Sequence, residues 1–155
     1  MVDVHTPDRR RKNMQAIRGK NTTPELVVRK LLFARGCRYR LHVTDLPGAP
    51  DIVLPRYRAV IFVHGCFWHG HDCYLFKLPQ TRSDFWRNKI DANCTRDSRH
   101  VQALLASGWR VLTVWECALK GRLKQSPDVL AARIAEWVLN AERDEATFGE
   151  LCFQN

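Results

Sequence analysis

One short segment holds the densest set of metal-ligating side chains in the sequence, reading HGCFWHGHDC over residues 64–73. Thiolate and imidazole ligands favour tetrahedral zinc over a hard cation such as magnesium. Cys66, His71 and Cys73 are close enough in sequence to fold around one ion. We expect Cys117 to be the fourth ligand, because it directly follows an apolar segment whose end could lie over the loop. The alternative is a loop of buried thiols and hydrogen-bonded histidines without metal.

A second set of residues could perform hydrolysis. Asp51 opens one predicted strand, His64 ends the next strand, and Glu25 lies early in a predicted helix. An aspartate at a strand edge can hold magnesium against a phosphate, and a neighbouring imidazole can move a proton or hold a water. A zinc ion with four protein ligands has no open position, which places catalysis here. Two alternatives stay open: Asp51 caps a turn, or the zinc keeps an open position and is itself catalytic.

The surrounding pattern predicts the elements that position these residues. Helix-start signals and apolar periodicity indicate helices over 23–36, 83–108 and 126–140, after a short basic helix within 6–19. Apolar alternation indicates strands over 39–43, 51–54, 58–64 and 109–115. This order predicts an α/β fold, a mixed sheet with helices on both faces.

Length and composition narrow the class of protein. A chain of 155 residues with 45% hydrophobic and 26% charged residues is expected to form one globular domain. We expect a basic arm over 1–20, a folded domain over 21–140 and a loose tail over 141–155. The sequence contains no apolar run long enough for a membrane span and begins without an export signal. We therefore expect a cytoplasmic protein with reduced cysteines.

Positive charge is concentrated near the beginning of the chain. Residues 9–40 contain 11 Lys and Arg against the single acid Glu25, a local balance of +10 within a total of +9. Such a distribution favours binding to a polyanion, most simply a nucleic-acid backbone. Arg10 and Lys12 are the candidate phosphate contacts. The alternative is a solvated basic face without a partner.

Several motifs together resemble those of the very short patch repair (Vsr) endonucleases. They are Lys12-Asn13-Met14, Thr23-Pro24-Glu25, Pro47-Gly48 with Pro50-Asp51, His64-Gly65-Cys66-Phe67-Trp68-His69, and Val114-Trp115-Glu116-Cys117. The resemblance implies a restriction-endonuclease-like fold with a zinc-stapled loop, in a bacterial protein associated with the nucleoid. It also implies nicking of DNA 5′ of the thymine in T:G mismatches, the product of 5-methylcytosine deamination, which starts short-patch repair.

The resemblance also assigns roles at the site. Asp51 would bind magnesium together with the backbone carbonyl of Val63, and Glu25 would hold metal-bound water. His69 would activate the attacking water with support from Asp97, and His64 would face the scissile phosphate. The family's zinc ligands match Cys66, His71, Cys73 and Cys117.

Two features of the sequence depart from related patterns. The wider nuclease fold commonly carries a second acid and a lysine on the strand where this sequence has Phe62 and His64, a departure shared by the Vsr group. Ala49 stands where we expect the family's arginine. This replacement affects an expected phosphate contact and leaves the metal site unaffected.

Mismatch recognition also has candidates. The resemblance implies that Phe67 and Trp68 wedge into the duplex beside the mismatch and that Met14 enters from the other side. Separating stacked base pairs costs the least free energy at a mismatch. The alternative for both aromatic residues is burial in the core. Lys89 and Asn93 are four residues apart on one predicted helix and could read base edges.

The sequence thus predicts a magnesium-dependent endonuclease with a structural zinc. We expect it to act as a monomer on T:G-mismatched double-stranded DNA, with other mismatch-repair proteins as further partners. The alternative is a zinc-stapled DNA-binding module without catalysis.

Overall fold

The computed structural model describes residues 22–122, 124–140 and 143–149. The predicted basic helix within 6–19 therefore lies outside the described residues, together with Arg10, Lys12 and Met14. Within the described part, no helix is long and apolar enough to cross a membrane.

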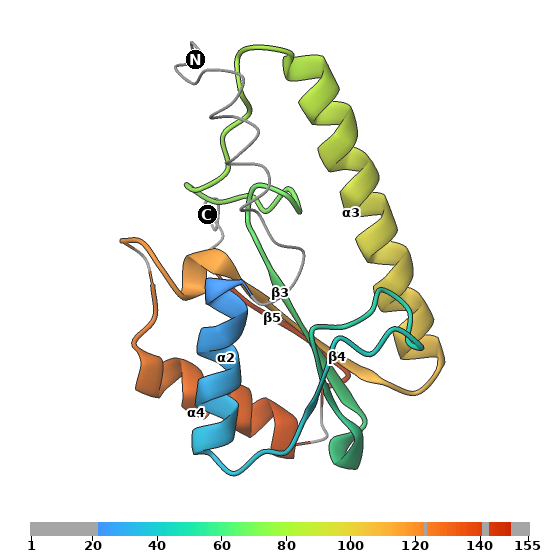
Figure 1. The fold of residues 1–155 in the computed structure, drawn as a ribbon, viewed down its shortest axis with the longest axis vertical. Coiled ribbons are helices and arrows are strands. Elements are labelled where there is room, and N and C mark those ends of the chain that lie inside the picture. Colours follow the sequence, from blue (N-terminus) through green and yellow to red (C-terminus); the bar gives the residue numbers. More distant parts are fainter. Residues whose placement is uncertain (1–21, 123, 141–142, 150–155) are drawn as a thin grey trace.

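A five-stranded mixed sheet forms the centre of the structure (Figure 1). In spatial order its strands are β1 (Arg40–Leu41), β2 (Ile52–Leu54), β3 (Ala59–His64), β4 (Arg110–Trp115) and β5 (Glu145–Phe148). β2 runs antiparallel to both β1 and β3, whereas β4 runs parallel to both β3 and β5. Two 3-10 turns, Pro55–Tyr57 and Glu116–Ala118, follow β2 and β4.

Helices cover both faces of the sheet, as predicted. α2 (Thr23–Ala34) and α4 (Pro127–Leu139) lie on one side, and the long α3 (Ser83–Ala106) runs along the other (Figure 1). Alternating strand residues face opposite ways: Ile61 packs in the α2 and α4 core, and Val60 packs in the core that contains Leu104 of α3. The mixed α/β architecture is therefore confirmed.

The helix starts follow from their capping residues. Thr22 accepts a hydrogen bond from the Glu25 amide at the start of α2, and Ser126 accepts one from the Val129 amide at the start of α4. α3 begins differently, because Arg82 precedes it in a left-handed conformation with φ of 56° and makes no side-chain cap.

One predicted boundary is wrong. Residues 145–148 form strand β5, although the sequence analysis expected the whole segment 141–155 to be loose. β5 pairs with β4, and its Phe148 is buried in the core beneath α4. Four residues with one large apolar side chain give almost no periodic signal, and this strand forms because β4 offers it an open edge.

Candidate active site and metal centre

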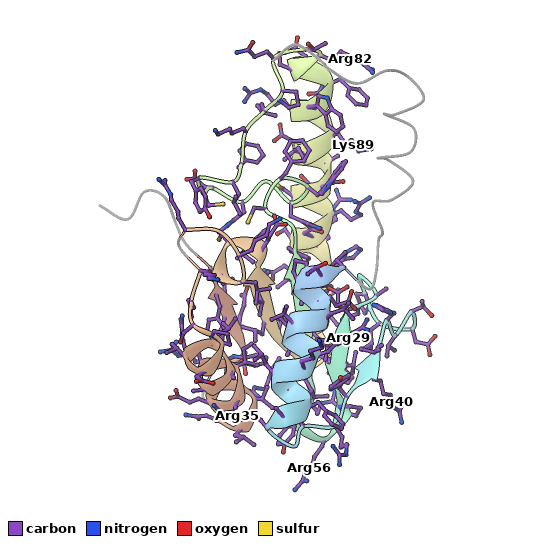
Figure 2. The ribbon with its side chains drawn as sticks, turned by 60° about the vertical axis from the view of Figure 1, so that its left-hand side comes forward. Arg29, Arg35, Arg40, Arg56, Arg82 and Lys89 are labelled. Carbon is purple, nitrogen blue, oxygen red and sulfur yellow. The ribbon has the colours of Figure 1, made fainter. Side chains whose placement is uncertain are left out.

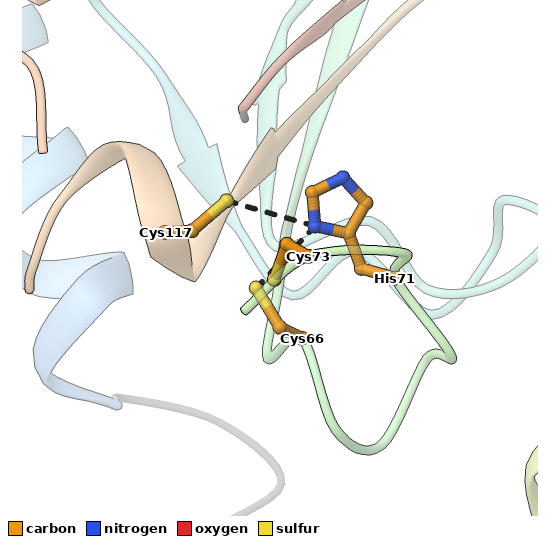
Figure 3. A group of neighbouring side chains, drawn as sticks. All are labelled: Cys66, His71, Cys73 and Cys117. Atoms are coloured by element: carbon orange, nitrogen blue, oxygen red, sulfur yellow. Dashed lines mark hydrogen bonds between the residues drawn. The ribbon is translucent and has the colours of Figure 1, made fainter. Parts of the chain in front are cut away.

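The Cys and His ligands converge on one buried point (Figure 3). The ligand atoms of Cys66, His71, Cys73 and Cys117 all lie within 4.8 Å of one another. The Nδ1 atom of His71 lies 3.5 Å from Sγ of Cys66 and 3.6 Å from Sγ of Cys117. The predicted set of four, including Cys117, is therefore brought together as expected.

The topology explains why Cys117 meets the loop. β3 and β4 are parallel neighbours, and His64 pairs with Trp115 at their carboxyl ends. The loop of residues 65–76 follows β3, and the turn that carries Cys117 follows β4, so both leave the same edge of the sheet.

The chemistry of the cluster fits a structural zinc ion. Burial raises the pKa of the Cys66 thiol, so a free thiolate would be costly there without a cation. Burial also lowers the pKa of His71, which favours the neutral imidazole that binds metal. Four protein ligands fill a tetrahedral shell, and all four side chains are buried.

The 65–76 loop packs tightly against α3 on its other side. Gly70 has φ of 63°, and a Cβ atom there would lie 2.7 Å from Sγ of Cys94 and 2.8 Å from Ile90, so only glycine fits. The Cys94 thiol donates a hydrogen bond to the carbonyl of His69 at 3.2 Å. The Cys and His cluster and α3 therefore hold the backbone around His69 from two sides.

A cavity of about 300 Å³ opens beside this loop. The residues that line it are Gly48, Ala49, Asp51, Phe62, Val63, His64, His69, Arg96, Asp97, His100 and Val101. Asp51 and His69, 18 positions apart in the sequence, thus face the same space. None of the four clustered Cys and His residues lines it, so within the described residues this cluster and the cavity are separate sites.

Two stacked imidazoles form one wall of the cavity. The rings of His64 and His69 lie 3.7 Å apart and nearly parallel, at 4°. The Nδ1 atom of His69 lies 2.5 Å from Oδ2 of Asp97. These three residues also form a group whose ligand atoms lie within 4.8 Å of one another.

The surroundings of His64 and Asp97 lower the pKa of both groups, for different reasons. Burial, with the nearby His69, lowers the pKa of His64 to about 3, so its imidazole is neutral at ordinary pH. Burial alone would raise the pKa of Asp97, but its hydrogen bond and attraction to His69 bring that pKa below the usual value. Asp97 is thus a stable anion that orients His69.

Asp51 is held at the start of β2, at the edge where β3 ends. Its Oδ2 accepts a hydrogen bond from the Val63 amide at 2.8 Å. Burial raises the pKa of its carboxyl to about 6, and the nearby Glu25 contributes to the increase. Burial thus disfavours the ionised form of Asp51, and a bound divalent cation would stabilise that form.

Glu25 lies next to Asp51, together with His42, a residue that the sequence patterns did not indicate. The ligand atoms of Glu25, His42 and Asp51 lie within 4.8 Å of one another, and Glu25 is only 1% exposed. His42 directly follows β1, which pairs with β2 so that Leu41 faces Ile52. This register continues to His42 and Asp51, and a strand-pairing argument could have identified the contact.

Phe67 and Trp68 are half-buried, between the two alternatives considered from sequence. Both pack against Trp86 of α3, with ring centres 5.6 Å and 5.8 Å away. Trp86 thus joins an aromatic cluster next to the 65–76 loop.

The two predicted base-reading residues of α3 have different surroundings. Asn93 donates a hydrogen bond to the Trp68 carbonyl at 2.9 Å and accepts one from Arg96 at 2.7 Å, so its amide holds the loop. Lys89 is exposed and lies with Arg82 toward the beginning of α3, the end of the molecule opposite Arg56 (Figure 2).

Comparison with known proteins gives strong matches. The family model of the DNA mismatch endonuclease Vsr matches residues 2–75. The chain is 50% identical to the DNA mismatch endonuclease Vsr of Escherichia coli (strain K12) over 138 residues, which cover 89% of this chain and 88% of the relative. It is 54% identical to the type II nicking enzyme V.XorIIP of Xanthomonas oryzae pv. oryzae over 134 residues, 83% of this chain and 98% of the relative.

A third relative, the type II nicking enzyme V.NmeAIP of Neisseria meningitidis serogroup A, is 45% identical over 122 residues, 79% of this chain and 87% of the relative. The cavity, the mixed sheet and these relatives together define a DNA endonuclease, a hydrolase of phosphodiester bonds. The chain belongs to the Vsr family of DNA mismatch endonucleases. The alternative of a DNA-binding module without catalysis is therefore set aside.

Proposed function

We propose that the protein is a magnesium-dependent endonuclease that nicks one strand on the 5′ side of the thymine in a T:G mismatch and so starts short-patch repair. The observation that carries this proposal is that Asp51, His64, His69 and Asp97 line one and the same cavity. The similarity to the Escherichia coli mismatch endonuclease supports the choice of lesion.

The carboxylate of Asp51 and the backbone carbonyl of Val63 would hold the magnesium ion. These are oxygen ligands, which magnesium prefers, and both residues line the cavity. When bound, the ion would polarise the scissile phosphate and offset its developing charge. Glu25, next to Asp51, would orient water at this end of the site.

His69 is the proposed general base. Its Nδ1 faces Asp97, which leaves Nε2 to take a proton from the attacking water. The water oxygen forms a bond to phosphorus while the ester bond to the leaving oxygen breaks. Neutral His64, stacked on His69, would donate or accept a hydrogen bond at the phosphate or its water.

Recognition would use the aromatic cluster and the positive residues. Phe67 and Trp68 would separate base pairs beside the lesion, which costs least where pairing is already weak. Met14 would enter from the opposite side, while Arg10 and Lys12 would contact phosphates. Lys89 and Asn93 would read the mismatch, which requires Asn93 to exchange the loop contacts described above for contacts with bases.

The Cys66, His71, Cys73 and Cys117 cluster is proposed to hold a structural zinc ion. Its burial and its complete set of four ligands support this role over a catalytic one. The ion would fix the 65–76 loop and with it His69. The asymmetric lesion offers no two-fold axis for a dimer to match, so we propose that the protein acts as a monomer, alongside other mismatch-repair proteins.

The names of two relatives favour a second candidate within the same family, a type II nicking enzyme. This candidate would also nick one strand of DNA, and the test below distinguishes the two by whether the nick requires the mismatch.

The test is to incubate end-labelled duplexes with the zinc-loaded protein and magnesium. Matched duplexes carrying T:G, T:A or C:G at one position, each in several flanking sequences, separate lesion recognition from sequence recognition. The proposal predicts a single nick 5′ of the mismatched thymine and none in the paired duplexes. Equal nicking of T:G and T:A duplexes would overturn the mismatch assignment.

A further inference from the structure

A network of ionic side chains lies next to Asp51 and joins Glu25 to two residues that the proposed reaction does not use, Arg29 and His42. The Oε1 atom of Glu25 accepts a hydrogen bond from Arg29 at 2.6 Å and also contacts Nε2 of His42. The Nη2 atom of Arg29 lies 3.4 Å from Nε2 of His42. Figure 2 shows Arg29 on α2, and the network therefore joins this helix to the edge of the sheet.

His42 reaches Glu25 through an unusual backbone conformation. Its φ of 47° lies in the left-handed region, which residues other than glycine adopt rarely and at some cost in energy. The conformation ends β1, while the His42 amide still donates a hydrogen bond to the Asp51 carbonyl at 3.1 Å. One residue thus contacts both the backbone of Asp51 and the side chain of Glu25.

The network places donor groups next to two neighbouring acids, Glu25 and Asp51. Two carboxyl groups lie within 4.8 Å of each other, and one of them is almost fully buried. Like charges at such a distance repel, and a buried carboxylate without hydrogen-bond partners is strongly unfavourable. Arg29 and His42 supply donors to the buried acid, and they fix the oxygen atom that faces them.

We propose that His42 and Arg29 are positioning residues for the proposed reaction: they fix the Glu25 carboxylate beside Asp51 and thereby set the geometry at which the divalent cation is bound. Neither side chain lines the cavity, and Glu25 does not line it either, so both act on the cation site through Glu25 and its neighbour Asp51. The inference rests on the proposed magnesium-dependent activity, but it concerns residues that this activity does not itself assign.

The test compares His42→Ala, His42→Gln and Arg29→Leu with the wild type, all as full-length zinc-loaded protein. Mn²⁺ binding is measured by calorimetry without DNA, and nicking of the T:G duplex is measured across magnesium concentrations. His42→Ala is expected to weaken Mn²⁺ binding and to lower nicking about ten- to a hundredfold, as for groups that orient metal ligands elsewhere. His42→Gln keeps a side-chain donor and is expected to recover most of the loss.

Arg56→Leu is the matched control for Arg29→Leu. Arg56 is an exposed side chain at the opposite end of the sheet that stacks on Tyr57, and its replacement removes the same charge without touching either acid. It is expected to bind Mn²⁺ as the wild type does. Thermal unfolding of each variant shows which molecules are folded, so that affinities refer to folded protein only.

Three results would overturn the proposal. Unchanged Mn²⁺ affinity in folded His42→Ala would make the network a stability feature only. Tighter binding would show that His42 competes with the cation. A nitrogen coupling in the pulsed EPR spectrum of bound Mn²⁺ that disappears in His42→Ala would make His42 a direct ligand. If the wild type fails to nick T:G duplexes, the proposed function fails, and the Mn²⁺ titration still decides the role of His42.

Discussion

The imidazole of His69 and the carboxylate of Asp97 meet at 2.5 Å, joining the 65–76 loop to α3 across 28 positions of the chain. The contact fixes which ring nitrogen of His69 faces the cavity. It also ties the proposed base to a helix that packs on the opposite face of the sheet from α2 and α4.

Removing the charge of Asp97 should slow nicking without abolishing folding. In Asp97→Asn the amide can donate to Nδ1 and favour the wrong tautomer of His69. We expect a loss in single-turnover rate that approaches the loss in His69→Ala, for which about 10²- to 10⁴-fold is typical of a general base. Asp91→Asn, on an exposed position of the same helix, is the control. A wild-type rate for Asp97→Asn would remove this residue from the reaction.

Asp51→Asn should stabilise the magnesium-free protein at neutral and higher pH while abolishing nicking. The fold raises the pKa of this carboxyl from 3.8 to about 6, so its ionised form opposes folding. The folded protein takes up the proton first, and wild-type stability therefore increases as the pH falls through 6, the gain being complete below 3.8. This difference between the two pKa values corresponds to about 3 kcal/mol in the free energy of unfolding.

Urea unfolding of wild type and Asp51→Asn measures this effect, with zinc retained and magnesium omitted. The variant is expected to be the more stable protein above pH 6, and the difference should shrink as the pH falls. Parallel curves for the two proteins would mean that Asp51 ionises in the folded state as it does in the unfolded chain.

Cys73→Ala should lose zinc and fold poorly, because a structural zinc ion contributes folding free energy directly. Metal analysis by mass spectrometry and thermal unfolding with and without chelator test this expectation. Cys37→Ala is the matched control, since Cys37 is buried in the core beside α2, away from the cluster, and its variant should keep its metal. Equal stability of the wild type with and without chelator would contradict a structural zinc.

Trp68→Ala should weaken binding to T:G duplexes more than to paired duplexes. Stacking of a base on an aromatic ring is worth about 1–3 kcal/mol, which corresponds to a loss of roughly fivefold or more. Fluorescence anisotropy with calcium in place of magnesium measures binding without cleavage. An equal loss on both duplexes would assign Trp68 to packing against Trp86 instead.

Local signals predicted much of this structure. The capping residues and apolar periodicity of α2 and α4 were sufficient to place both helices, because those signals act within a few residues. The convergence of Cys117 with Cys66 was predicted because Cys117 directly follows an apolar strand whose end could lie over the loop. The parallel pairing of β3 and β4 provides that geometry.

Features that depend on pairing partners were not accessible in the same way. β5 exists because β4 presents an edge, and nothing in the tetrapeptide itself specifies a strand. His42 is significant only through the register of β1 on β2 and its left-handed backbone. The hydrogen bonds of Asn93 to Trp68 and Arg96 likewise depend on how the 65–76 loop lies on α3.

The joint action of Asp51 and His69 on one phosphodiester is tested most directly by a double-mutant cycle. Single-turnover nicking of the T:G duplex is measured for wild type, Asp51→Ala, His69→Ala and the double variant. Groups that serve one chemical step are strongly non-additive, so the double variant should be no slower than the slower single variant. Losses that multiply, or Asp51→Ala nicking at the wild-type rate, would contradict a shared active site.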